Sequence, residues 1–389
     1  MINIGKKMMA EMRRVATFDL PLHGGKAPQW LIIRMKKLGK AITEIIIEEF
    51  GPKELLKRLS DPLWFQALSY VLGYDWNSSG TTTVLTGVLR EILEPNMGIL
   101  VAGGKGKRAL DTPADITRIG EIFSFSSSRV NELIRASRLA AKVDNALVQD
   151  NHSIYHHAMF IAKDGTWAIV QQGMSVELKS ARRYHWISEG LKSFVVDPHS
   201  GISGSVKLPF ILNLASKDSI EAQKISVDLV KEGVKNIRRD LQKISRATLG
   251  IRDITLYFSN GGARENISRS ISEVNIRILP MKVNWQALEK AYELQPKDYE
   301  ELISIRGIGP GTLRALALIA ELIYDARVCW RDPLRYTFAM GGKDGVPYPV
   351  NVKRMEKVAG FLEDIIRDLR IGNSEKVKLL KRLSKLIPR

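Results

Sequence analysis

The chain has 389 residues, which is long for a single hydrophobic core, so two or three domains are expected. Its 44% hydrophobic and 26% charged residues are typical of globular proteins. No apolar run reaches the length of a membrane span, and residues 1–14 lack the apolar core of a secretory signal. A cytoplasmic protein without membrane contact is therefore predicted. The lone Cys329 excludes an internal disulfide and a zinc site built from cysteines.

The net charge of +17 is the second broad property of the chain. Such an excess attracts polyanions and supplies the salt-dependent part of nucleic-acid binding. A solvated surface of a thermophilic protein is the alternative, but such surfaces favour networks of mixed sign and do not explain the imbalance. Nucleic acid, with DNA as the first expectation, is therefore the predicted partner.

The first part of the chain reads as mostly helical. Pro28 suits the first turn of a helix that runs to Phe50, and Asp61 with Pro62 begins another. A long amphipathic pattern, typical of a helix, covers residues 127–147. We predict an N-terminal helical domain over residues 1–148.

A glycine-rich basic loop, Gly103-Gly104-Lys105-Gly106-Lys107-Arg108, interrupts this part. Its glycines lack the spacing of a P-loop, so it does not indicate nucleotide hydrolysis. Lys105 and Lys107 are candidates for contact with an anion. An ordinary turn is the alternative.

The middle of the chain changes to the period of a β-strand. Asp164-Gly165 between the apolar runs 154–162 and 167–172 predicts a β-hairpin with a two-residue turn. That turn would set His157 opposite Gln172. Both faces of the hairpin are largely apolar, so it should belong to a sheet covered on both sides, with its polar residues at the open end. We predict a small central β-sheet module at about 150–215, between helical regions. A further strand is expected at 254–258, and residues 149–279 form the predicted second, α+β domain.

Five of the six histidines lie between residues 152 and 199. Histidine is the usual general acid or base and a frequent metal ligand. Either a divalent metal, Mg²⁺ or Mn²⁺, activates water, or a histidine acts without metal. Purely structural histidines are the third possibility. The predicted catalytic residues are His157, His185, His199, Asp197 and Gln172, with Arg182 and Arg183 as phosphate-binding neighbours.

The C-terminal part contains two helical patterns separated by Gly307-Ile308-Gly309. Glycine permits a sharp reversal, and the free amides at the start of the second helix suit a phosphate. The stretch from Tyr299 to Ile323 resembles the helix-hairpin-helix motif, which implies a grip on the DNA backbone without base reading. A plain helix hairpin is the alternative. The resemblance assigns nucleic-acid contacts to Gly307, Ile308, Gly309, Gly311, Thr312 and Arg314.

This predicted third domain covers residues 280–372 and precedes a basic tail at 373–389. Many DNA glycosylases carry the same hairpin, and those with lyase activity have a catalytic lysine just after it. Gly311 holds that position here, and Cys329 holds the position of their aspartate, which argues against the lyase mechanism. A glycosylase without lysine is the least favoured reading.

Several short segments together resemble the family called domain of unknown function 763, which is found in archaea and thermophilic bacteria. The resemblance spans nearly the whole chain, and the family name implies no activity. The segments are Asp75-Trp76-Asn77-Ser78-Ser79-Gly80, Tyr155-His156-His157, Gln171-Gln172-Gly173-Met174, Arg182-Arg183-Tyr184-His185-Trp186, Asp197-Pro198-His199 and Gly341-Gly342-Lys343-Asp344-Gly345.

Taken together, these patterns predict a predominantly helical α+β protein that processes DNA. The leading hypothesis is a nuclease, or another phosphodiester-acting enzyme of repair or recombination, that binds the backbone without sequence preference. The alternative is a DNA-binding protein without catalysis.

Overall fold

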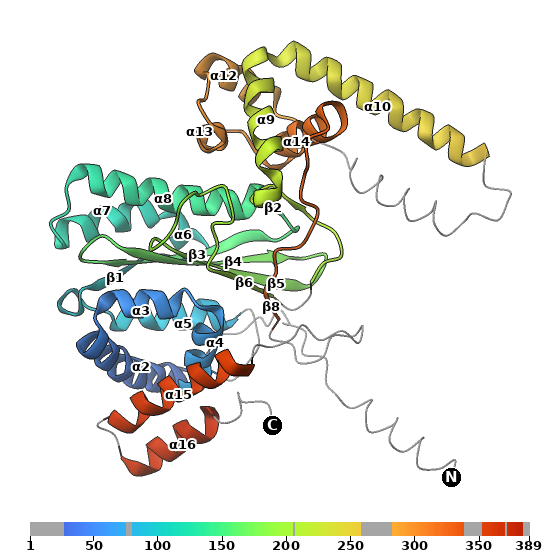
Figure 1. The fold of residues 1–389 in the computed structure, drawn as a ribbon. Coiled ribbons are helices and arrows are strands. Elements are labelled where there is room, and N and C mark those ends of the chain that lie inside the picture. The colour runs from blue at the N-terminus through green and yellow to red at the C-terminus, as the bar shows by residue number, and fades with distance from the viewer. Residues whose placement is uncertain are drawn as a thin grey trace, which may run out of the picture.

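The structure is a computed structural model that describes residues 27–74, 80–204, 207–257, 282–337, 352–369 and 372–383. A central sheet lies between two helical layers, and a third group of helices lies beyond one of them (Figure 1). The fold is therefore α+β and predominantly helical, as predicted. Within the described residues no helix is both long and apolar enough to cross a bilayer.

The central sheet has six strands in the order β1-β3-β4-β5-β6-β8. Every neighbouring pair is antiparallel except β6 and β8. The two edge strands come from outside the predicted 150–215 module. One is β1, in which Gly103, Gly104 and Lys105 extend a strand rather than forming the predicted loop. The other is β8, at residues 336–337. The strands are β1 (Ile99–Lys105), β3 (Ser153–Ala162), β4 (Trp167–Ser175), β5 (Ser180–Ile187), β6 (Gly201–Gly204) and β8 (Tyr336–Thr337); β2 (Val148–Gln149) and β7 (Leu212–Asn213) form a separate pair.

The β3–β4 hairpin exists, but its predicted register is wrong by one residue. Ala162 N donates to Thr166 O at 2.9 Å, so three residues and not two form the loop. Gly165, the last of them, has φ of 83°, which suits the bulged three-residue loop. His157 consequently pairs with Gln171 and not with Gln172. The slip moves every side chain of β4 to the face opposite the predicted one.

One face of the sheet packs on the N-terminal helices α2 (Gln29–Phe50), α3 (Pro52–Leu59), α4 (Pro62–Val71) and α5 (Gly80–Ile92). Met35, Ile42 and Ile46 lie on one side of α2 and are fully buried. The Asp61 carboxylate caps α4 by accepting from Leu63 N at 2.9 Å. Helices α15 (Val352–Asp368) and α16 (Asn373–Leu383) complete this layer through Ile366 and Leu379, so part of the predicted basic tail is helical.

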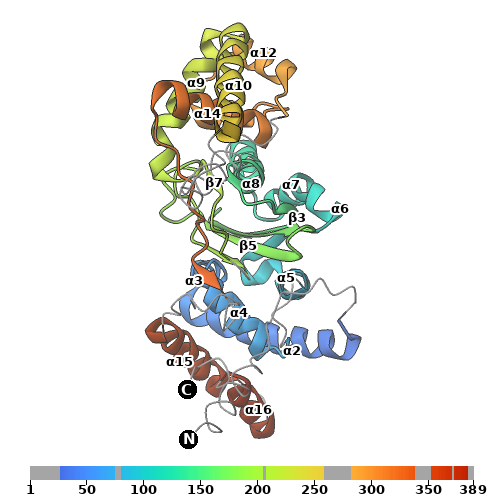
Figure 2. The same ribbon diagram turned by 90° about the vertical axis from the view of Figure 1, so that its right-hand side faces the viewer.

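The opposite face packs on α6 (Lys107–Leu110), α7 (Thr112–Ile122) and α8 (Ser127–Ala146). The two hydrophobic clusters on the two faces confirm that the sheet is covered on both sides. Beyond α8 lies the third group of helices, which Figure 2 shows from the side. It consists of α9 (Ile220–Glu232), α10 (Val234–Tyr257), α12 (Trp285–Leu294), α13 (Tyr299–Ser304) and α14 (Pro310–Tyr324).

The strand expected at 254–258 is wrong, because α10 continues to Tyr257. The apolar repeat of three or four residues that Ile237, Leu241 and Ile244 begin runs on to Ile251 and Ile254. This longer helical period outweighs the β-branched composition of the segment. Phe258 lies outside the described residues.

Candidate functional site

Buried polar side chains gather at the open end of the β3–β4 hairpin, on both faces of the sheet. Because side chains alternate along a strand, His157 and Gln171 face α8, whereas Gln172 and His185 face the N-terminal helices. The predicted single site with His157, His185, His199 and Gln172 is therefore wrong. The sheet separates these residues into two networks.

The network under α8 is a chain of hydrogen bonds. Ser137 Oγ lies 2.9 Å from His157 Nε2, and His157 Nδ1 donates to Gln171 Oε1 at 2.9 Å. Gln171 Nε2 in turn donates to Asp144 Oδ2 at 2.5 Å. These four side chains are buried, and burial lowers the pKa of His157, so its imidazole is neutral.

The chain ends at a dyad of Asp144 and His199. His199 Nε2 lies 2.5 Å from Asp144 Oδ1, and Trp186 Nε1 donates to Oδ2 at 3.0 Å. Burial raises the pKa of Asp144, against the lowering effect of His199 and of these hydrogen bonds. Among the described residues no group bonds His199 Nδ1. A carboxylate that fixes one imidazole nitrogen leaves the other to accept or donate a proton, so this dyad has the geometry of an acid–base pair.

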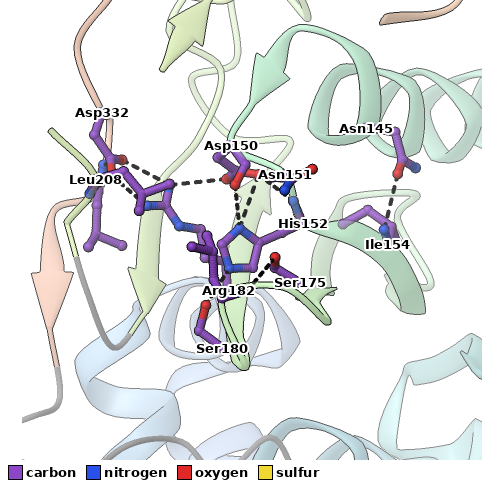
Figure 3. Close-up of polar contacts among 12 residues, drawn as sticks. Asn145, Asp150, Asn151, His152, Ile154, Ser175, Ser180, Arg182, Leu208 and Asp332 are labelled. Carbon is purple, nitrogen blue, oxygen red and sulfur yellow. Dashed lines mark hydrogen bonds and ion pairs between the residues drawn. The ribbon is translucent and has the colours of Figure 1, made fainter. Parts of the chain in front are cut away.

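Arg182 lies at the centre of a buried ion cluster on the same face (Figure 3). Its Nη1 donates to Asp150 Oδ2 at 3.0 Å and to Asp332 Oδ1 at 2.9 Å, and Nη2 bonds Asp332 Oδ2. Tyr184 and His152 also bond Asp150. Burial alone would raise the pKa of Asp150, but these partners outweigh it and the pKa is lowered. With 1% of its surface exposed, Arg182 is a structural ion and not the predicted nucleic-acid contact.

Arg183 and His185 form the corresponding cluster on the other face. Arg183 Nε donates to His185 Nε2 at 2.9 Å, and Arg183 Nη1 donates to Gln66 Oε1 at 3.2 Å. His185 Nδ1 donates to the carbonyl of Leu59 at 2.9 Å. Burial lowers the pKa of Arg183 to about 9. The predicted contact of Arg183 with nucleic acid is wrong, because the side chain is enclosed between β5 and α4.

Gln172 bonds Thr82 and Tyr155 on that same face. His156, its neighbour across the strands, lies 2.9 Å from Thr86 Oγ1, and burial lowers the pKa of His156 to about 3. Asp197 is exposed and has φ of 43°, and no hydrogen bond or ion pair of its carboxylate within the described chain joins it to either network. Of the five predicted catalytic residues, His157 and His199 are joined through Gln171 and Asp144.

Sequence reasoning missed Ser137 and Asp144. Both lie on the buried stripe of α8, between Leu133 and Ala146, where polar residues are unusual. That position on an otherwise apolar stripe was the available signal. Within the described ranges no group of three or more His, Cys, Asp or Glu side chains gathers as metal ligands would, and the divalent metal stays a prediction.

The helix hairpin is formed by α13, a turn at 305–309 and α14. Gly307 is exposed with φ of 94°, and Gly309 is the N-cap of α14. Ile308 is fully buried, and Thr312 Oγ1 accepts from Asn284 N at 3.0 Å. The side chains of Ile308 and Thr312 therefore hold the turn in place, whereas Arg306 and Gly307 are exposed.

The C-terminal half of α8 and the residues after it hold this turn. Lys142 Nζ bonds the carbonyl of Ile308, and Gln149 Nε2 donates to the carbonyl of Pro310 at 2.9 Å. Arg314 Nε donates to Gln149 Oε1 at 2.8 Å. Gly311 packs against the backbone of Lys282, where an added Cβ would approach the carbonyl oxygen to 2.5 Å. The other predicted cations, Lys105 and Lys107, are exposed near the end of β1.

The fold and the buried networks define an α+β protein with a helix hairpin fixed to the central helix α8. The chain belongs to the family described as protein of unknown function (DUF763), whose model matches residues 16–350. This match confirms the predicted family resemblance, although segments 75–79 and 341–345 lie outside the described residues. Comparison with curated proteins and with solved structures gives no match.

Proposed function

We propose that the protein binds the phosphate backbone of nucleic acid, with DNA as the first candidate, through the turn at 307–309. The observation that carries this proposal is the open backbone in front of α14. Among the residues that the structure describes, no side chain caps the helix at Gly309, and a Cβ added there would have the carbonyl of Gly307, at 4.0 Å, as its one neighbour outside the adjoining residues. The first amides of a helix lack intrahelical partners and favour an anion. The net charge of +17 supports a polyanionic ligand.

A single substitution at Gly309 tests the turn without straining it. Gly309 has φ of −117° and ψ of −177°, which any residue adopts. Gly309→Glu is expected to weaken binding of duplex DNA at least about tenfold, because the carboxylate occupies the phosphate position. An acidic residue at a helix start does not destabilise the helix, so the loss is one of binding and not of folding. Fluorescence anisotropy with a labelled duplex measures it.

The matched control is Gly309→Ala, which adds a methyl group to open space. It should bind within about threefold of the unchanged protein, because alanine adds no charge at the phosphate position; as a poorer N-cap than glycine, it lowers helix stability and not affinity. Equal affinity of the glutamate variant and the unchanged protein would contradict the proposed role of the turn. Equal affinity for unrelated duplex sequences is also expected, because amides that hold phosphate read no bases.

The Asp144–His199 dyad favours a second candidate, a phosphodiester-acting enzyme. In this scheme His199 Nδ1 takes a proton from water, the hydroxide attacks phosphorus, and the departing ester oxygen takes a proton from solvent. Bound Mg²⁺ or Mn²⁺ would assist by neutralising charge on the phosphate. In this candidate His199 performs the chemistry, and the chain of hydrogen bonds that begins at Ser137 holds Asp144 and His199 in position.

The enzymatic candidate predicts cleavage that depends on His199. Labelled single-stranded, duplex and branched DNA are incubated with the protein in Mg²⁺, Mn²⁺ or EDTA. His199→Gln should slow any cleavage by about 10²–10⁴-fold and leave DNA affinity unchanged, because a general acid or base contributes on this order. DNA that is bound but stays intact in all these conditions would eliminate this candidate and leave the binding proposal standing.

A further inference from the structure

Helix α8 carries a stripe of three cations beside the hairpin. Arg135, Arg138 and Lys142 are spaced three and four residues apart, so they lie on one side of the helix. Arg135 and Arg138 are exposed and Lys142 is half-buried. The stripe extends over roughly 10 Å of helix axis, since each residue adds about 1.5 Å.

Both ends of this stripe are bonded to the hairpin. Arg135 forms an ion pair with Glu300 on α13, and Lys142 bonds the carbonyl of Ile308 in the turn. The segment 300–308 therefore runs alongside the stripe, and Arg138 lies midway between the two attachments. Figure 1 shows α13 directly above α8.

The charges where the α8 stripe lies beside the hairpin are only partly neutralised. Glu300 compensates Arg135, whereas Arg138 and the exposed Arg306 of the turn form no ion pair within the described ranges of the chain. Lys142 gives one N–H to a carbonyl and has two further N–H donors, although burial lowers its pKa. Lys142 and Arg306 thus border the turn, and Arg138 continues the row of positive charge along α8.

We propose that the α8 stripe and the turn form one surface for the backbone of a nucleic-acid duplex, with Arg138 and Lys142 as additional phosphate contacts. This inference rests on the proposed function. One strand of a duplex carries a phosphate about every 3.4 Å along the axis, so the stripe spans about three phosphates. Proteins that prefer single strands offer aromatic side chains for stacking. Along 131–145 and 299–311 the sole aromatic residue is Tyr299, which is buried.

The test is the salt dependence of duplex binding. For Arg138→Gln we expect lower affinity for every sequence and a slope of log K against log[salt] reduced by about 0.9, the value for one lost phosphate contact. Lys142→Gln should reduce the slope by a similar amount. The control is Lys36→Gln on α2, which removes the same charge from the far side of the sheet, where Lys36 pairs with Glu91. Its slope should not change.

The outcomes separate this inference from the proposed function. An unchanged slope for Arg138→Gln, together with weakened binding by Gly309→Glu, overturns the composite surface and retains the turn. Tighter binding of single strands than of duplexes also overturns it. Duplex DNA and duplex RNA are compared in parallel, and either one giving the slope change supports the inference. Failure to bind any nucleic acid overturns both proposals.

Discussion

Replacing Arg182 with methionine is expected to lower the free energy of unfolding by on the order of 3–5 kcal/mol. The guanidinium is 1% exposed and bonds the carboxylates of Asp150 and Asp332. Its removal leaves two acidic groups close together in the interior without a counter-charge. Chemical denaturation followed by circular dichroism measures the loss, and thermal unfolding should shift to lower temperature.

A surface ion pair gives the comparison for this variant. Lys224 pairs with Glu221 on α9, with about two thirds of each side chain exposed, so Lys224→Met should cost less than about 1 kcal/mol. A small loss for Arg182→Met would mean that the cluster relaxes or admits water.

The pH dependence of the stability that Asp150 contributes has a definite sign, because folding lowers the pKa of Asp150. Its contribution to stability is present above the ordinary pKa of aspartate and is lost as the pH falls through the lowered value.

Asp144→Ala is expected to have the second large effect, a loss of on the order of 3 kcal/mol or more. The substitution leaves His199 Nε2, Gln171 Nε2 and Trp186 Nε1 without their common acceptor in a buried site. Each unsatisfied buried donor costs about 1–3 kcal/mol. Chemical denaturation of the variant and of the unchanged protein measures this difference in the free energy of unfolding.

The isosteric variant Asp144→Asn separates hydrogen bonding from charge. Its amide oxygen still accepts from Gln171 and Trp186, so most of the stability should remain. Burial raises the pKa of Asp144 in the folded state. The folded protein therefore keeps this proton above the unfolded pKa, and stability falls as the pH rises from that value through the raised one. Asp144→Asn should abolish this component; a variant with the same pH profile as the unchanged protein would show that Asp144 does not titrate in this way.

Local sequence patterns predicted most helices and strands of this fold correctly. They predicted the pairing of strands from distant parts of the chain less well. Apolar periodicity and capping residues predicted α2, α4 and α8, and two apolar faces predicted a sheet covered on both sides. The joining of β1 and β8 to that sheet depends on contacts between distant segments, which no local pattern records. The β3–β4 register depended on a single residue in the loop at 163–165, and the wrong loop length exchanged the two faces of β4.

The candidate site shows the same division. Clustering in sequence drew attention to His157, His185 and His199. Strands β3 and β5 place His157 and His185 on opposite faces of the sheet, so closeness along the chain did not bring His185 to the other two. Asp144, which organises the network, comes from a helix that precedes the histidine-rich segment. Two adjacent arginines, Arg182 and Arg183, are typical of a phosphate site. In the structure both are buried, and their N–H groups donate to Asp150, Asp332 and Gln66.

The packing of α15 and α16 against the N-terminal helices has a consequence for synthesis on the ribosome. The hydrophobic cluster under the sheet contains Leu38 and Trp64 near one end of the chain and Ile366 and Leu379 near the other. The first helices leave the exit tunnel long before their C-terminal partners are translated. Part of their apolar surface therefore stays exposed in the nascent chain, and chaperones bind exposed segments of this kind. The helical layer can be completed only after translation has passed Leu379.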